Sequence, residues 1–76
     1  MKDLVATFAR FLVDDPDRVS VRERNDQGRL VLELAVAPSD RGRVIGKGGR
    51  TAAALRTVLE AVAARRGQSV TLEIRD

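Results

Sequence analysis

The spacing of apolar residues changes from a helical to a strand-like period within the first forty positions. One apolar stripe with steps of one, three and four residues is formed by Leu4, Val5, Phe8, Phe11 and Leu12. Such spacing predicts a helix, which we expect Asp3 to cap and which should end near Val13. Both phenylalanines lie on the stripe, so we expect them in the core and not in base stacking. Residues 14–17, Asp-Asp-Pro-Asp, predict a turn, because proline cannot continue a helix interior.

Alternating apolar and polar positions then predict a β-hairpin. Val19 and Val21 begin the pattern, and residues 25–28, Asn-Asp-Gln-Gly, have turn chemistry. The alternation resumes over eight positions at Leu30, Leu32, Leu34 and Val36. Pro38 should end the second strand, and Ser39 is placed to cap a short helix that runs through Asp40 to about Ile45.

A second long helix and a last strand complete the pattern. The helix should begin at Arg50 or Thr51 and end before Gly67. Its apolar positions include Leu55 and Val58, which we assign to the core. Alternation at Val70, Leu72 and Ile74 predicts the final strand. The element order αββααβ favours an α+β fold, in which residues 1–76 form one domain with three helices on one face of a three-stranded sheet.

Composition narrows the functional classes. The 76 residues contain no apolar run near the roughly 20 residues of a membrane span and no secretory pattern, so we expect a cytoplasmic protein. The chain has no cysteine and no histidine, which removes disulfides, thiolate metal sites and the commonest general base. The aspartates lie where turns and caps are expected. We therefore expect no catalytic residue, no cofactor and no metal.

Charge is distributed unevenly along the chain. Residues 1–40 hold six basic and eight acidic side chains, whereas residues 41–76 hold eight basic and three acidic ones. Four of the basic side chains, Arg41, Arg43, Lys47 and Arg50, fall within ten positions that contain no acid. Such a concentration of positive charge is typical of a surface that binds a polyanion, although a solvated basic face has the same composition.

Two common phosphate-binding glycine motifs do not match the glycine-rich segment. In a Walker loop, four residues separate the first glycine from a Gly-Lys pair, and a Ser or Thr follows the lysine. Here only three residues separate Gly42 from Gly46, and Gly48 follows Lys47. The dinucleotide fingerprint GxGxxG is also absent, and the preceding element is not a strand. These mismatches argue against a nucleotide hydrolase and a dinucleotide-binding enzyme.

The segment Val44 to Arg50, Val-Ile-Gly-Lys-Gly-Gly-Arg, joins a short helix to a long one and resembles the GXXG loop of KH domains. The element order is similar to that of type II KH domains, and the whole chain resembles the KhpA family of small bacterial KH proteins. Physical chemistry agrees, since Gly46 and Gly49 let a sugar-phosphate chain approach the backbone. Lys47, Arg50 and the free N–H groups of the long helix would attract phosphate.

The resemblance implies a single-stranded RNA-binding module and a set of contact residues. The loop would clamp the backbone of about four nucleotides, while the bases lie in a groove beside Ile45, Ala53, Ala54 and residues 70–74. Arg41 and Arg43 would flank the phosphate track. The predicted RNA-binding residues are Arg41, Arg43, Ile45, Gly46, Lys47, Gly48, Gly49, Arg50 and Thr51.

The resemblance also implies a protein partner, and two other functions stay open. The partner would be a second copy or a larger KH-domain protein, KhpB, with RNA chaperoning as one role for the pair. A single small site should bind weakly, which favours linkage to a second site. The alternatives are a protein-interaction adaptor that keeps the KH fold and a binder of single-stranded DNA, since such a groove need not demand a 2′-hydroxyl.

Overall fold

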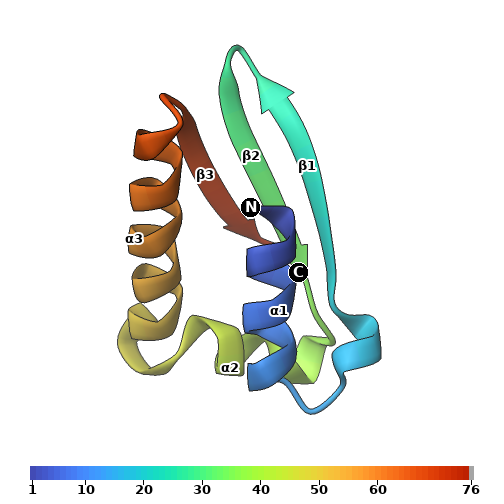
Figure 1. The fold of residues 1–76 in the computed structure, drawn as a ribbon. Helices are drawn as coiled ribbons and strands as arrows, with labels where there is room; N and C mark the ends of the chain where they lie inside the picture. The colour runs from blue at the N-terminus through green and yellow to red at the C-terminus, as the bar shows by residue number, and fades with distance from the viewer. Residues whose placement is uncertain (76) are drawn as a thin grey trace.

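The protein is an α+β domain with one sheet and its helices on one side (Figure 1). A computed structural model describes residues 1–75. The helices are α1 (Lys2–Leu12), α2 (Arg41–Ile45) and α3 (Arg50–Arg65), and the strands are β1 (Ser20–Asp26), β2 (Arg29–Ala35) and β3 (Ser69–Ile74). Short 3-10 turns cover Pro16–Arg18, Pro38–Asp40 and Lys47–Gly49. The predicted order αββααβ is confirmed.

The sheet has the strand order β1-β2-β3, with β2 in the centre. β1 pairs antiparallel with β2, from Ser20 opposite Ala35 to Asp26 opposite Arg29. β2 pairs parallel with β3, and Leu32 lies opposite Leu72. A parallel pair needs a long crossover, which α2 and α3 supply. The crossover places the glycine-rich segment at one end of the molecule, between these two helices (Figure 1).

The core lies between the helices and the inner face of the sheet. Leu32 and Leu34 of β2 are fully buried, and they meet Val5 and Ala9 of α1 and Leu59 of α3. Alternation along β2 sends its leucines to the helices, as the sequence pattern predicts. Full burial of a Leu or Val side chain contributes roughly 1.5–3 kcal/mol, so this small set of residues supplies much of the stability of the domain.

Helix α1 differs from the expectation in its cap and in the burial of Phe11. Met1 occupies the N-cap position and Asp3 lies inside the first turn, so the prediction that Asp3 caps the helix was wrong. Phe8 packs partly against the core, but Phe11 is 87% exposed. Phe11 follows the buried Ala9 by two residues, roughly 200° around the helix, and therefore faces away from the sheet. The prediction of Phe11 in the core was wrong.

Two further expectations fail beyond α1. Val58 was expected in the core with Leu55; Leu55 is buried, but Val58 is 48% exposed because it lies one residue, about 100°, from the buried Leu59. Ser39 lies within the 3-10 turn Pro38–Asp40 and does not cap α2. Asp40 occupies that N-cap position, and its side chain bonds elsewhere because the preceding turn points it back toward α1.

The outer face of the sheet carries an ion-pair network in place of a second helical layer. The Arg24 side chain donates to Glu33 at 2.8 Å, and Arg75 donates to the other oxygen of Glu33 at 3.1 Å. Arg24 also lies 3.5 Å from Glu73 across the sheet. The hydrogen bond from Arg24 lowers the pKa of Glu33 below its ordinary value. These contacts join β1, β2 and the end of β3 on the side without helices.

Across residues 1–75, no helix is both long enough and apolar enough to span a membrane.

Candidate nucleic-acid interface

The glycine-rich loop has a backbone that depends on its glycines. Gly46 has φ 79° and ψ 168°, and Gly49 has φ 76° and ψ 12°, both in regions that other residues rarely adopt. The Gly49 N–H donates to the Gly46 carbonyl at 3.0 Å, which closes the turn. A Cβ on Gly48 or Gly49 would meet no atom within 4 Å, so the outer side of the loop is open to a ligand.

Gly46 is also required by packing. A Cβ at this position would lie 2.8 Å from the backbone nitrogen of Thr51 and 2.7 Å from its Cβ. Thr51 is half-buried in the first turn of α3, directly under the loop. The close contact fixes the angle at which the loop enters α3. Thr51 therefore supports the loop from beneath, and the RNA contact that the sequence predicts for it stays a prediction.

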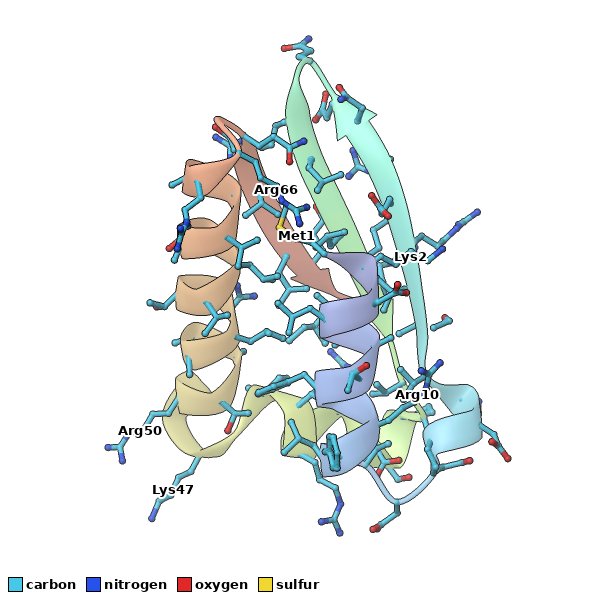
Figure 2. All side chains as sticks on the ribbon, in the orientation of Figure 1. Met1, Lys2, Arg10, Lys47, Arg50 and Arg66 are labelled. Carbon is cyan, nitrogen blue, oxygen red and sulfur yellow. The ribbon has the colours of Figure 1, made fainter. Side chains whose placement is uncertain are left out.

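The loop directs positive charge and free backbone donors to one point. Gly49 is the N-cap of α3, and no side chain caps this 16-residue helix. The Arg50 N–H donates to the Lys47 carbonyl, whereas the N–H groups that follow have no side-chain partner. Lys47 and Arg50 are exposed and point outward at this end of the molecule (Figure 2). Neither forms an ion pair with a carboxylate within the described chain. The helix dipole and both side chains thus attract phosphate at the same place.

Helix α2 is held in place by a buried carboxylate. Asp40 is 1% exposed, and its two oxygens accept hydrogen bonds from the backbone N–H groups of Asp14 and Asp15, each at 3.1 Å. Arg43 lies 3.5 Å from Asp40 and 3.0 Å from Asp14. The contacts tie the end of α1 to the start of α2, one short helix before the loop. The position of Asp40 in the sequence predicts only a turn or cap residue and gives no sign of this role.

The predicted contact residues fall into three groups. Gly46 to Arg50 form the open loop. Arg43 is engaged by Asp14 and Asp40, which leaves its charge partly neutralised. Arg41 and Ile45 of α2 and Thr51 of α3 are half-buried, as are Gly46 and Gly49 of the loop. The exposed members of the loop are Lys47, Gly48 and Arg50. The structure thus places the nine residues together and separates the loop, the ion-paired Arg43, and the half-buried Arg41, Ile45 and Thr51.

A groove runs between α3 and the edge strand β3. It has a volume of about 170 Å³ and is lined by Arg29, Arg56, Leu59, Glu60, Val70, Thr71 and Leu72. The Arg56 guanidinium donates to the Leu72 carbonyl at 3.4 Å, and Arg29 donates to the Thr71 hydroxyl at 3.1 Å. Of the residues expected to form the base groove, only Val70, Thr71 and Leu72 line this hollow, and a base-binding role for it stays a prediction.

Arg29 and Arg56 are groove residues that sequence analysis missed. They are 27 positions apart and neither adjoins the GXXG segment, so no local motif connects them. Only the parallel pairing of β2 with β3 brings Arg29 next to the groove. One signal in the sequence could have indicated Arg56. It lies three residues before the buried Leu59 on α3, and this spacing places Arg56 at the edge of the buried face of the helix. Ala53 and Ala54, which were expected there, are exposed.

Comparison with known families gives a match over nearly the whole chain. The model of a family described as KhpA/KhpB, KH domain, matches residues 2–74. Proteins named RNA-binding protein KhpA are similar to the chain. The one from Halalkalibacterium halodurans is 51% identical over all 76 residues of both chains. The one from Clostridium acetobutylicum is 50% identical over 74 residues, which covers 97% of this chain and 99% of the relative.

A structural neighbour supports the fold. The chain superposes with a TM-score of 0.53 on part of a crystal structure of Aquifex aeolicus Era bound to GDP and aluminium fluoride. The match covers 96% of this chain and 28% of the larger one, at 23% sequence identity. At that identity the likeness concerns the arrangement of helices and strands alone.

Proposed function

The chain belongs to the KhpA/KhpB family of KH domains, and we propose that it binds single-stranded RNA by clamping the sugar-phosphate backbone with residues 46–49. One observation carries the proposal: an open glycine loop begins an uncapped 16-residue helix and projects two unpaired cations, Lys47 and Arg50. The name of the relatives, RNA-binding protein, supports RNA as the polyanion. Residues 1–76 would act as one KH unit.

The clamp has a simple physical basis. A phosphate placed over the loop would receive backbone hydrogen bonds from the start of α3 and the positive end of its dipole. Lys47 and Arg50 would add full charges on either side. The glycines leave no Cβ between the ligand and the backbone, so the phosphate can come within hydrogen-bond distance. These contacts recognise the backbone and carry no information about base sequence.

The bases would lie along the groove between α3 and β3. Arg56 is exposed and offers a guanidinium at the groove edge, whereas Leu59 and Val70 form the floor of the groove with buried side chains. The described residues contain no exposed aromatic in this groove, so recognition would rest on edge hydrogen bonds and apolar contact in place of a stacking platform. We expect weak affinity and modest base preference, with a steep dependence on salt.

Weak binding by one domain favours a second RNA-binding unit. A second copy or a larger KH protein would raise the effective concentration of the second site without new contacts in the first. The family description, which couples KhpA with KhpB, supports such a partner. RNA chaperoning, transient binding that lets a strand exchange its pairing, would suit a site of low affinity. We propose no catalytic role, because the most buried carboxylate, Asp40, already accepts structural hydrogen bonds.

The test is fluorescence anisotropy with a short unstructured RNA at two salt concentrations. Wild type is compared with the double variant Lys47→Asp, Gly48→Asp and with a charge-matched control, Lys2→Asp, Gln68→Asp. Both variants lower the net charge by three, but Lys2 lies beside the middle of the molecule in Figure 2, away from Lys47 at the bottom. Circular dichroism confirms that all three proteins are folded.

The loop variant should lose binding and the control should keep most of it. Equal loss in both would mean that net charge, not the loop, carries affinity. Full binding by the loop variant, or no binding by wild type, would instead favour the adaptor function. Competition with a DNA oligomer of the same sequence tests the third alternative, since equal competition would show that the 2′-hydroxyl is not read.

A further inference from the structure

The groove between the neighbouring elements α3 and β3 (Figure 1) carries two arginines and one carboxylate at its rim. Arg29, Arg56 and Glu60 are all exposed, and all three line the same hollow of about 170 Å³. Arg56 precedes Glu60 by four residues, a spacing at which a guanidinium and a carboxylate on one helix can meet. Glu60 nevertheless forms no hydrogen bond or ion pair within residues 1–75. The groove therefore holds a carboxylate with unused acceptors beside two cations.

Strand β3 holds the two arginines in place of Glu60. The Arg56 guanidinium donates to the Leu72 carbonyl at 3.4 Å, and Arg29 donates to the Thr71 hydroxyl at 3.1 Å. These bonds use only part of each guanidinium, which has several N–H donors in a fixed fork. The remaining donors stay at the rim, in positions set by β3. The groove thus presents fixed donors toward β3 and a free acceptor on α3.

The four RNA bases differ in how well they match such a combination. Guanine and uracil carry an N–H on the ring nitrogen of their Watson–Crick edge, and a carbonyl oxygen lies next to it. Adenine and cytosine carry a lone pair at that ring nitrogen, and an amino group lies next to it. A carboxylate can accept the ring N–H, and a guanidinium can donate to the carbonyl. The lone pair of adenine or cytosine would instead face a negative oxygen.

We propose that Glu60 and Arg56 select the keto bases, guanine before uracil, for the position of the RNA that enters this groove. Glu60 accepts the ring N–H, and Arg56 donates to the neighbouring carbonyl. Guanine ranks first because its amino group lies beside the ring N–H and can donate to the second oxygen of Glu60. The selection rests on the proposed function, since the glycine loop must hold the RNA backbone before a base reaches the groove.

The groove lies within reach of a strand held at the loop. Arg56 follows Arg50 by six residues, which is about 9 Å along α3. A strand of about four nucleotides spans at least about 10 Å, even at the stacked rise of about 3.4 Å per nucleotide. One base of such a strand can therefore contact the rim while the loop binds the backbone.

Fluorescence anisotropy with a uridine octamer and a cytidine octamer measures the selection, because the two pyrimidines have the same size and differ in this edge. Wild type should bind the uridine octamer about five-fold more tightly. Glu60→Gln, whose amide can donate as well as accept, should bring the ratio of the two affinities close to one. Glu23→Gln removes the same charge from an exposed position outside the groove and should leave the ratio unchanged.

A second pair of octamers tests the rank of guanine. A uridine octamer with two central guanines should bind wild type more tightly than the same octamer with inosine, which lacks the amino group. Glu60→Gln should remove this difference. Circular dichroism confirms that both glutamine variants fold.

The outcomes separate base selection from backbone binding. Equal affinities of wild type for uridine and cytidine octamers, with binding that Lys47→Asp, Gly48→Asp abolishes, would overturn the selection and leave the loop clamp standing. A uridine preference that Glu60→Gln does not change would overturn the role of Glu60. No binding of wild type to any octamer would overturn the clamp itself, and the selection with it.

Discussion

Gly46 and Thr51 approach so closely that no side chain fits between them: a Cβ on Gly46 would lie 2.8 Å from the Thr51 nitrogen. We expect Gly46→Ala to destabilise the domain by about 2 to 4 kcal/mol, because overpacking adds to the cost of a positive φ. Gly49→Ala meets no atom and should cost only about 1 to 2 kcal/mol. Urea unfolding of the two variants measures the difference.

A companion substitution identifies the origin of the Gly46 effect. Thr51→Ala removes the hydroxyl but keeps the backbone nitrogen and Cβ that crowd the site. Combining it with Gly46→Ala should therefore recover little stability. Full recovery would mean that the hydroxyl alone causes the crowding.

Asp40 should be the most sensitive carboxylate in the protein. Asp40→Asn replaces one acceptor oxygen by an NH₂ group that faces a backbone N–H, so a buried donor loses its partner at a cost of about 1–3 kcal/mol. Asp17→Asn, an exposed position in the neighbouring turn, is the matched control and should change stability by less than about 0.5 kcal/mol. Urea unfolding at neutral pH compares them, and equal effects would contradict a structural role for Asp40.

The lowered pKa of Glu33 predicts how the free energy of unfolding changes at acidic pH. Its pKa in the folded protein lies below the ordinary value because Arg24 donates a hydrogen bond to the charged form. The unfolded chain therefore takes up a proton more readily, and the stabilisation is present above the ordinary pKa of about 4.5. It is lost as the pH falls through the lower folded pKa. Wild type should lose stability over this acidic range.

The matching variant is Glu33→Gln, which keeps the shape of the side chain without its charge. It should be less stable than wild type at pH 7, and the gap should narrow as the pH falls below the ordinary pKa of Glu33. Denaturant unfolding at pH 7 and at several acidic values provides the measurement. A gap that stays constant with pH would show that the network does not depend on the Glu33 charge.

Lys47→Ala should change the salt dependence of RNA binding as well as its strength. If Lys47 neutralises one phosphate, the slope of log affinity against log salt should fall by about 0.7, the value for single strands. Lys2→Ala, at a position away from Lys47, should leave the slope unchanged (Figure 2). Anisotropy titrations at four salt concentrations give both slopes, and an unchanged slope for Lys47→Ala would remove Lys47 from the phosphate track.

The helices and strands could be predicted from the sequence, because the spacing of buried residues along one element depends only on neighbouring positions in the chain. The alternation along β2 and the helix that begins at Arg50 agree with the structure. The sequence could not show how much of the circumference of α1 and α3 is covered by the sheet. Phe11 and Val58 lie on apolar stripes, but the covered faces of α1 and α3 are narrower than those stripes, which leaves both residues exposed.

Of the candidate site, the sequence predicted the glycine-rich loop but not the contacts that surround it. Residues 46–49 form a contiguous motif, and their positive φ angles follow from the need for glycine. Asp40 with the backbone of Asp14 and Asp15, and Arg29 beside Thr71, join positions 25 to 42 residues apart. Such contacts depend on how the elements pack. A single sequence contains no periodic signal for them.

The two arginines at the β3 edge also protect the sheet from unwanted growth. An outer strand exposes backbone groups on which a strand from another molecule can assemble, the first step toward fibrils. Here Arg56 donates to the Leu72 carbonyl and Arg29 to the Val70 carbonyl at 3.5 Å, so two of the acceptors that an incoming strand would need are already engaged. The same two arginines also place positive charge along this edge, which disfavours the addition of another strand.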